Sequence, residues 1–234
     1  MYGRKLIQHN TVNEDIDEYD KMLLNDLLGL PYMPEQKGSV AGADRNENPI
    51  VFFEISAGGG RKLKNGVTTQ PQVLGRMYIE LRKDIVPVAA GNFMALCSGI
   101  RGRGEDGVNY HYKGTRIHRI VKDMLFQSGD LLDSKGECSR SIYNHGGLFR
   151  DESFVLRHTG AGVFSYCNRG PDTNGSLFQV SFTQAQDLDN KYVVFGCLAD
   201  KASYDTLHKI NSYGTPWGEP KEEIRISDCG IAYP

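Results

Sequence analysis

The sequence predicts a mainly β fold: a closed antiparallel barrel whose ends are capped by two helices, preceded by a helical extension. From residue 49 onward, seven or eight short runs rich in β-branched and aromatic residues dominate the chain. Two segments, 86–99 and 203–214, have helical patterning instead. Residues 1–48 hold nine acidic and five basic residues and end in a loop-like stretch, so we expect a domain boundary there, with the barrel at 49–234.

The extension carries the signature of one amphipathic helix, at about residues 12–28. Thr11 and Glu14 have the spacing of a capping box, in which side chains satisfy the free amides of a first helical turn. Apolar residues then recur at helical spacing from Ile16 to Leu27, until Gly29 ends the pattern. Its apolar stripe has three readings: it folds back on the barrel, it docks on another protein, or the segment stays disordered.

The barrel strands are expected where apolar and polar residues alternate. Pro87 suits the first turn of the first helix, and Gly214 ends the second. Two longer loops, at 58–72 and 99–114, connect these elements. The expected strands lie at 49–56, 74–82, 115–120, 124–130, 162–168, 176–182, 192–199 and 223–230.

Charge and cysteine usage exclude several classes of partner. The chain has 27 Lys+Arg against 29 Asp+Glu, so no net field attracts nucleic acid or an anionic membrane. Its five cysteines form an odd set without a Cys-x-x-Cys pair, which argues against a disulfide framework or a zinc site. No signal-like or membrane-spanning apolar run is present, so we expect an intracellular protein, in the cytoplasm or in a nuclear or ciliary assembly.

Motifs for cofactors and metals fail on context. Residues 102–107 match the dinucleotide pattern G-x-G-x-x-G, but they follow a helix, precede none, and include two carboxylates where a pyrophosphate would lie. The six histidines lack metal-ligand spacing, and His118 and His158 are expected to be core or hydrogen-bonding residues. We therefore expect no cofactor and no metal.

Residues 117–130, IHRIVKDMLFQSGD, place a cation and an amide, Arg119 and Gln127, beside the apolar side chains of Met124 and Leu125. This segment and five others resemble, in order, the conserved blocks of the cyclophilin family, over residues 49–231. The other blocks are NPIVFFEIS at 48–56, LGRMYIEL at 74–81, the long run at 141–180, LDNKYVVFG at 188–196 and ISDCG at 226–230.

The resemblance implies an eight-stranded barrel with two helices and peptidyl-prolyl cis/trans isomerase chemistry, which needs no cofactor. Rotation about the bond before proline must cross a barrier of roughly 18 to 20 kcal/mol. By resemblance, Arg119 is the catalytic residue, because its fixed charge can stabilise the twisted amide. An alternative is that Arg119 is merely a surface ion-pair partner.

The implied peptide-binding set is partly conserved and partly altered. Gln127, Gly136, Asn168 and Leu188 match the family, and Leu125 and Cys167 complete the lining. Departures from the family pattern occur at Met124 and Gln179, which replace two phenylalanines; at Arg169 and Leu177, which replace a small residue and a glutamine; and at Tyr192, which replaces a histidine.

Of the two phenylalanine replacements, Gln179 is expected to be the more damaging, because its amide must be desolvated by the proline ring, at a cost of about 1 to 3 kcal/mol if it is left unpaired. A loss of about 2 to 4 kcal/mol in transition-state binding lowers the rate roughly 30- to 1000-fold. Asp187 stands where the family often has the tryptophan that contacts cyclosporin, so weak cyclosporin binding is expected.

Two functions follow from this sequence. One is a cyclophilin-type isomerase, or binder of proline-containing segments, with weak activity. The other is an inactive cyclophilin-like scaffold subunit of a larger intracellular assembly, for example spliceosomal or axonemal, whose extension docks on a partner protein. The resemblance also raises a redox pair between Cys97 and Cys229, against the alternative of two separate buried thiols.

Overall fold

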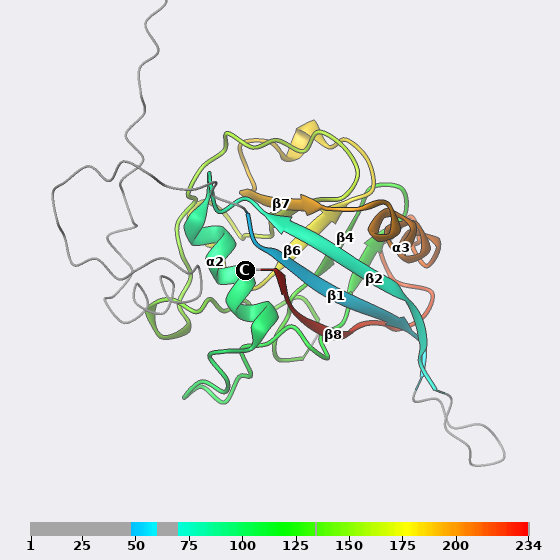
Figure 1. Cartoon of the computed structure of the whole chain (residues 1–234), viewed down its shortest axis with the longest axis horizontal. Coiled ribbons are helices and arrows are strands. Elements are labelled where there is room, and N and C mark those ends of the chain that lie inside the picture. The colour runs from blue at the N-terminus through cyan, green and yellow to red at the C-terminus, as the bar shows by residue number, and fades with distance from the viewer. Residues whose placement is uncertain (1–47, 60–69, 134, 234) are drawn as a thin grey trace, which may run out of the picture.

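The computed structural model describes residues 48–59, 70–133 and 135–233. The helix expected at about 12–28 lies outside the described residues, as does most of the loop at 58–72. The prediction of a mainly β fold is confirmed: the described chain contains eight strands and two α-helices (Figure 1). Two short 3₁₀ turns, Asn144–Gly146 and Gln186–Leu188, interrupt the loops.

Every expected strand is present, most of them shorter than the sequence pattern suggested. The largest difference is at 115–120, where the strand itself covers Arg119–Val121. The strands are β1 Ile50–Ala57, β2 Gln72–Leu81, β3 Arg119–Val121, β4 Leu125–Ser128, β5 Val163–Tyr166, β6 Phe178–Ser181, β7 Val194–Leu198 and β8 Ile224–Tyr233.

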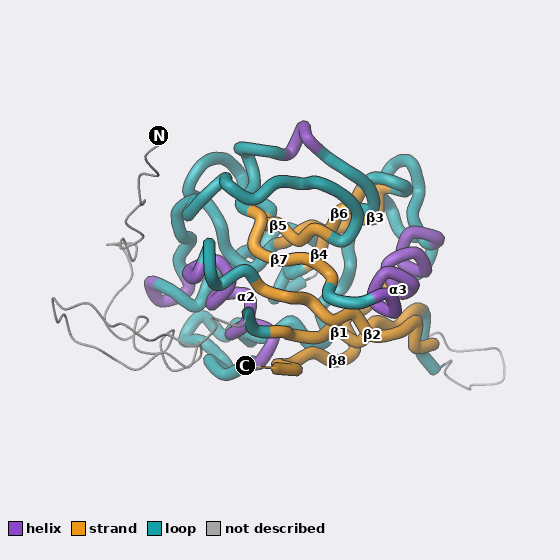
Figure 2. The backbone as a smooth tube through the Cα atoms, turned by 45° about the horizontal axis from the view of Figure 1, so that its top comes forward, coloured by secondary structure: helices purple, strands orange, loops and turns teal. Residues whose placement is uncertain are grey.

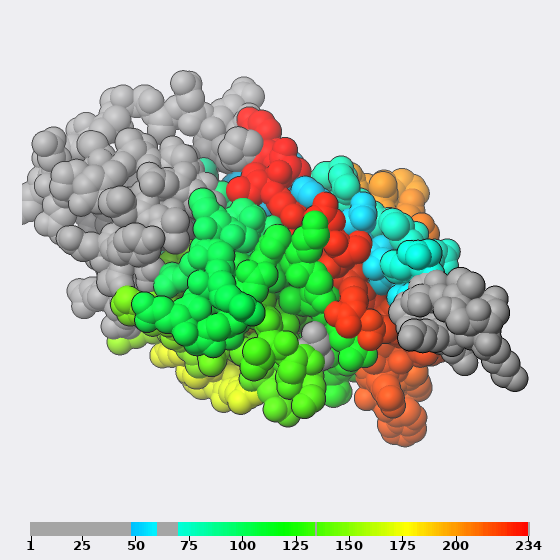
Figure 3. Space-filling model, turned by 90° about the horizontal axis from the view of Figure 1, so that it is seen from below, coloured from blue at the N-terminus to red at the C-terminus, as the bar shows by residue number. Residues whose placement is uncertain are grey.

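The strands form one curled antiparallel sheet in the order β3-β4-β6-β5-β7-β2-β1-β8 (Figure 2). The segment before β3 reaches across to β8, because the Ile117 N–H donates to the Ile224 carbonyl at 2.9 Å and the Ile226 N–H to the Thr115 carbonyl at 3.0 Å. Figure 3 shows β8, in red, at the surface between the green segment that includes residues 100–118 and the blue and cyan β1 and β2. These bonds draw the two edges of the sheet together.

The helices flank the curled sheet (Figure 1). Helix α2, Pro87–Ser98, begins at the expected proline and ends at Gly99, whose φ of 67° is left-handed. Helix α3, Lys201–Ser212, begins two residues before the expected segment, because the Asp200 carboxylate accepts the Ser203 N–H at 2.8 Å and caps it. Neither described helix is long and apolar enough to cross a membrane.

Aromatic rings fill the space between α2 and the sheet. Phe93 of α2 lies 4.6 Å from Phe195 and 5.3 Å from Phe178, measured between ring centroids. Every residue from 88 to 97 is buried, so this helix has no polar face at all. This close-packed core fixes the positions of strands β4, β5 and β6. The opposite face of these strands carries polar side chains.

Candidate functional site

A row of polar side chains crosses four neighbouring strands. The strand register sets Arg119 of β3 opposite Gln127 of β4, Gln127 opposite Gln179 of β6, and Gln179 opposite Ser165 of β5. Residues directly opposite each other in antiparallel strands point to the same face. The four side chains therefore share one face of the curled sheet, away from the aromatic core.

A continuous hydrogen-bonded chain follows this row inward. The Gln127 amide donates to Gln179 Oε1 at 3.4 Å, and Gln179 Nε2 donates to Ser165 Oγ at 3.2 Å. Ser165 Oγ lies 2.9 Å from His158 Nε2, and His158 Nδ1 lies 2.9 Å from Asp189 Oδ1. Burial lowers the pKa of His158, an effect that Asp189 partly offsets, so the ring is neutral at pH 7. The proton then sits on Nδ1, and Nε2 accepts from the serine hydroxyl.

The position of Gln179 corrects the expectation of an unpaired amide at the pocket floor. Gln179 is 3% exposed, and both ends of its amide are bonded, with the Cys167 thiol 3.5 Å from Oε1 as a further neighbour. Hydrogen bonds within the protein therefore compensate most of the free-energy cost of burying this amide. What remains is a polar floor that also holds the Gln127 amide.

Arg119 is exposed, and its stem lies against the turn that follows α3. A Cβ on Gly218 would lie 3.0 Å from Arg119 Cγ, and Gly218 has a φ of +93°, so glycine is required on both counts. Among the described residues, no carboxylate lies within ion-pair distance of Arg119.

A cavity of about 510 Å³ opens beside Gln127 of the polar row. It brings together six of the residues expected to bind the peptide: Gln127, Gly136, Cys167, Asn168, Arg169 and Leu177. Burial raises the pKa of the Cys167 thiol to about 12, so it is protonated and unreactive at neutral pH.

One rim of this cavity is organised by Asp130, a role that the sequence did not reveal. Its carboxylate accepts five backbone N–H groups, those of residues 132, 133, 136, 137 and 138, at 2.8 to 3.2 Å. Burial alone would raise the pKa of Asp130, but these donors outweigh it and hold the pKa well below its usual range. Gly136, with a φ of +85°, is needed there because a Cβ would lie 2.6 Å from His118 Nε2.

The other expected residues lie outside that cavity. Met124 is 49% exposed at the turn between β3 and β4, and Leu125 is buried two positions before Gln127, on the same face. Leu188 ends a 3₁₀ turn, and its carbonyl accepts the Tyr192 N–H at 3.3 Å. The Asn168 side chain donates to the Lys191 carbonyl at 2.9 Å, which ties this region to the cavity rim.

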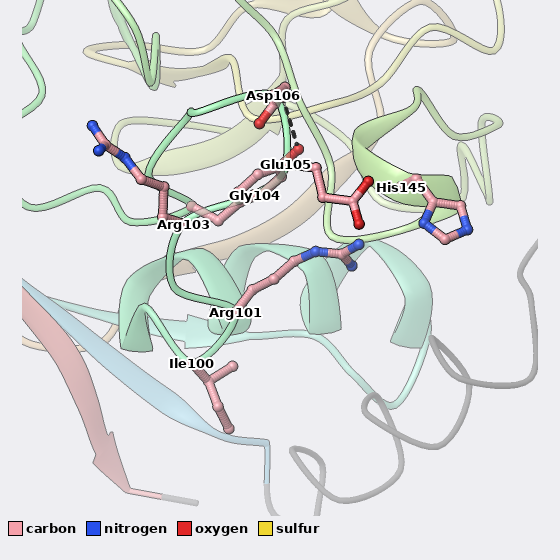
Figure 4. Close-up of a pocket in the computed structure, with 8 residues that line it drawn as sticks. Ile100, Arg101, Arg103, Gly104, Glu105, Asp106 and His145 are labelled. Carbon is pink, nitrogen blue, oxygen red and sulfur yellow. Dashed lines mark hydrogen bonds between the residues drawn. The ribbon is translucent and has the colours of Figure 1, made fainter.

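A smaller cavity, of about 260 Å³, lies under the loop at 99–114. Asp106 in this loop accepts a hydrogen bond from Tyr110 and pairs with Arg140 Nε at 3.2 Å. Figure 4 shows Arg101 and His145 turned toward Glu105 across the cavity. Acidic and basic groups are thus mixed, which gives the cavity no preference for an anion, and residues 102–107 form a turn rather than a phosphate loop.

All five cysteines lie in the described part of the chain and are free thiols. Cys97 and Cys229 are free, buried thiols, and burial raises the pKa of Cys229 to about 12. Within the described ranges, no group of three or more potential ligands could hold a metal ion.

Comparison with known proteins identifies relatives of this arrangement. Residues 66–231 match the family described as "Cyclophilin type peptidyl-prolyl cis-trans isomerase/CLD". The chain is 39% identical over 201 residues to "E3 SUMO-protein ligase RanBP2" of Homo sapiens and of Pan troglodytes. The match covers 85% of this chain and 6% of each relative, so the chain spans a small part of the length of those proteins.

Proposed function

Because the chain belongs to the cyclophilin-type peptidyl-prolyl cis-trans isomerase family, we propose that it binds proline-containing segments over Arg119 and isomerises them slowly. One observation carries this proposal: the exposed Arg119 stands directly opposite Gln127 in the pairing of β3 with β4.

Isomerisation of the bond before proline requires few protein groups beyond this arrangement. The bond before proline resists rotation because its nitrogen lone pair is delocalised into the carbonyl, and the uncatalysed reaction takes tens of seconds or longer. During rotation the lone pair returns to the nitrogen. A guanidinium that donates to that nitrogen lowers the barrier.

The polar floor is what makes the reaction slow. Gln179 is 3% exposed and polar, so it gives a proline ring little apolar surface to contact, which removes about 1 to 1.5 kcal/mol of contact energy. Gln127 must also release its long hydrogen bond to Gln179 before it can bind a peptide, at a cost of about 1 kcal/mol. Together these amount to about 2 to 2.5 kcal/mol, or roughly a 30- to 70-fold loss of rate.

A protease-free isomerisation assay on several Xaa-Pro peptides tests this proposal. We expect a rate above the thermal background for the native chain and none for Arg119→Ala. Arg119→Lys keeps the charge but lacks the planar fork, so it should recover a small part of the rate. If the native chain gives no rate and no peptide binding, the proposal fails.

A second function, as a docking unit of a larger intracellular assembly, is favoured by one comparison. The similar stretch in the human relative is 6% of a much longer protein, so there this type of domain is one part of a large chain. Deleting residues 1–48 should then remove the protein from its complexes, whereas Arg119→Ala should leave it there. An unchanged sedimentation profile of the deletion variant in cell extracts would contradict this role.

A further inference from the structure

An exposed tryptophan stands beside the proposed catalytic arginine. Trp217 is 87% exposed, the most of any large apolar side chain in the described ranges, and it is the single tryptophan of the chain. Its neighbour Gly218 is the residue that packs against the Arg119 side chain. An exposed aromatic ring next to a binding face offers a ligand a large apolar surface, and its indole N–H remains free to interact with water.

The turn that carries Trp217 is tied firmly to β3. The Ile120 N–H donates to the Gly218 carbonyl at 2.8 Å, and the Lys122 N–H donates to the Thr215 carbonyl at 3.1 Å. Within the turn, Thr215 Oγ1 accepts from the Gly218 N–H at 3.1 Å and donates to the Glu219 carbonyl at 2.9 Å. The turn is therefore an added edge of the sheet, and it presents the indole from a fixed backbone.

Distance limits what can touch both groups at once. One peptide unit spans about 3.8 Å between Cα atoms, so the Trp217 backbone lies within about 8 Å of the Arg119 side chain, given the close approach at Gly218. In a polyproline II helix, two prolines separated by two residues are about 9 Å apart. A segment with one proline over Arg119 can therefore place a second proline on the indole.

We infer that Trp217 is a specificity-determining residue that binds the second proline of a Pro-x-x-Pro segment. The inference rests on the proposed function, because the first proline occupies the Arg119 face. Proline rings pack well on aromatic faces, and a polyproline II segment loses little entropy on binding because it is already extended. Either proline can take the Arg119 position, so one of the two registers directs the other proline toward Trp217.

Because the chain has a single tryptophan, its fluorescence emission can report peptide binding at Trp217. Peptides of the forms Pro-x-x-Pro, Pro-x-x-Ala and Ala-x-x-Pro are titrated against the full chain, and binding is followed by tryptophan emission and by calorimetry. We expect the two-proline peptide to shift the emission and to bind roughly tenfold more tightly than either single-proline peptide, a difference of about 1.4 kcal/mol. The single-proline peptides should bind while leaving the emission nearly unchanged.

Variants separate this inference from the function on which it rests. Trp217→Ala should remove the tenfold advantage of the two-proline peptide, and Trp217→Phe should keep most of it. Val155→Ala is the matched control, because Val155 is also an exposed apolar side chain, at 70%, and its loss should change nothing.

Equal binding of all three peptides to the native chain and to Trp217→Ala would overturn the role of Trp217 and leave the proposed function standing. Absence of any peptide binding would overturn both.

Discussion

Replacing Gln179 with phenylalanine changes the proposed proline pocket at one point, its floor. The amide is 3% exposed and bonds to Gln127 and Ser165. Phenylalanine removes both bonds. Ser165 still has His158 as a partner at 2.9 Å, and Gln127 faces the open cavity, so neither is left buried without a hydrogen bond.

The gain can be worked from the same contacts. Gln179 is 3% exposed and offers almost no surface to a ligand, whereas the larger apolar ring of phenylalanine can contact the proline; about 50 Å² of such contact is worth about 1.3 kcal/mol. Release of the 3.4 Å bond between Gln127 and Gln179 adds about 0.5 to 1 kcal/mol, because Gln127 is then free to bind the peptide backbone. Gln179→Phe should therefore raise kcat/KM for an Xaa-Pro peptide roughly 20- to 50-fold.

Gln179→Ala separates the two contributions. It frees Gln127 without supplying an aromatic floor, so its rate should rise less than that of the phenylalanine variant. The assay is protease-free isomerisation, and thermal unfolding checks that the larger ring is accommodated, since overpacking costs about 1 to 3 kcal/mol. A folded Gln179→Phe protein whose kcat/KM equals that of the native chain would refute the explanation of slow turnover by a polar floor.

Three further predictions concern the residues around the site. Asp130→Asn should lower the free energy of unfolding by about 2 to 3 kcal/mol in urea denaturation, because an amide offers one acceptor oxygen to five N–H donors. Folding depresses the pKa of Asp130, so in the native chain this stabilisation is present above about pH 4 and is lost below it. Because burial lowers the pKa of His158, this residue takes up a proton in the unfolded chain at a higher pH than in the folded chain, so the free energy of unfolding should fall as the pH drops below about 6.5. His158→Gln should flatten that pH dependence, and an equally steep profile in the variant would contradict this prediction. Asp187→Trp should raise the affinity for cyclosporin, as calorimetry would measure it for the native and variant chains, because an aromatic side chain replaces an exposed carboxylate.

The sequence was informative where signals are local. The eight-residue spacing of Arg119 and Gln127 falls on two strands that pair directly, so their opposition could be expected from one short segment. The first helix could be predicted from its apolar run and from Pro87, which suits a first turn, and the structure begins α2 at that residue. The second helix begins two residues before its sequence pattern predicts, because the Asp200 carboxylate caps it. An Asp three residues before Ser203 is a start signal that the apolar pattern alone does not include.

Long-range pairings could not be predicted in the same way. Gln127 and Gln179 are 52 residues apart, and it is the register between β4 and β6 that sets them opposite each other. The same holds for Ser165, which receives the Gln179 amide through the pairing of β5 with β6. The sequence alone therefore leaves open whether the Gln179 amide is paired, and the register of three strands supplies its partners.

The central claim is that Arg119 accelerates rotation about the bond before proline. Equilibrium exchange between the cis and trans forms of an Xaa-Pro peptide, measured by NMR with catalytic amounts of the full chain, tests it directly. The uncatalysed exchange takes about 10 to 100 s. We predict exchange faster than this with the native chain, and the uncatalysed rate with Arg119→Ala at the same concentration. Equal acceleration by both proteins, or none by the native chain, would contradict the claim.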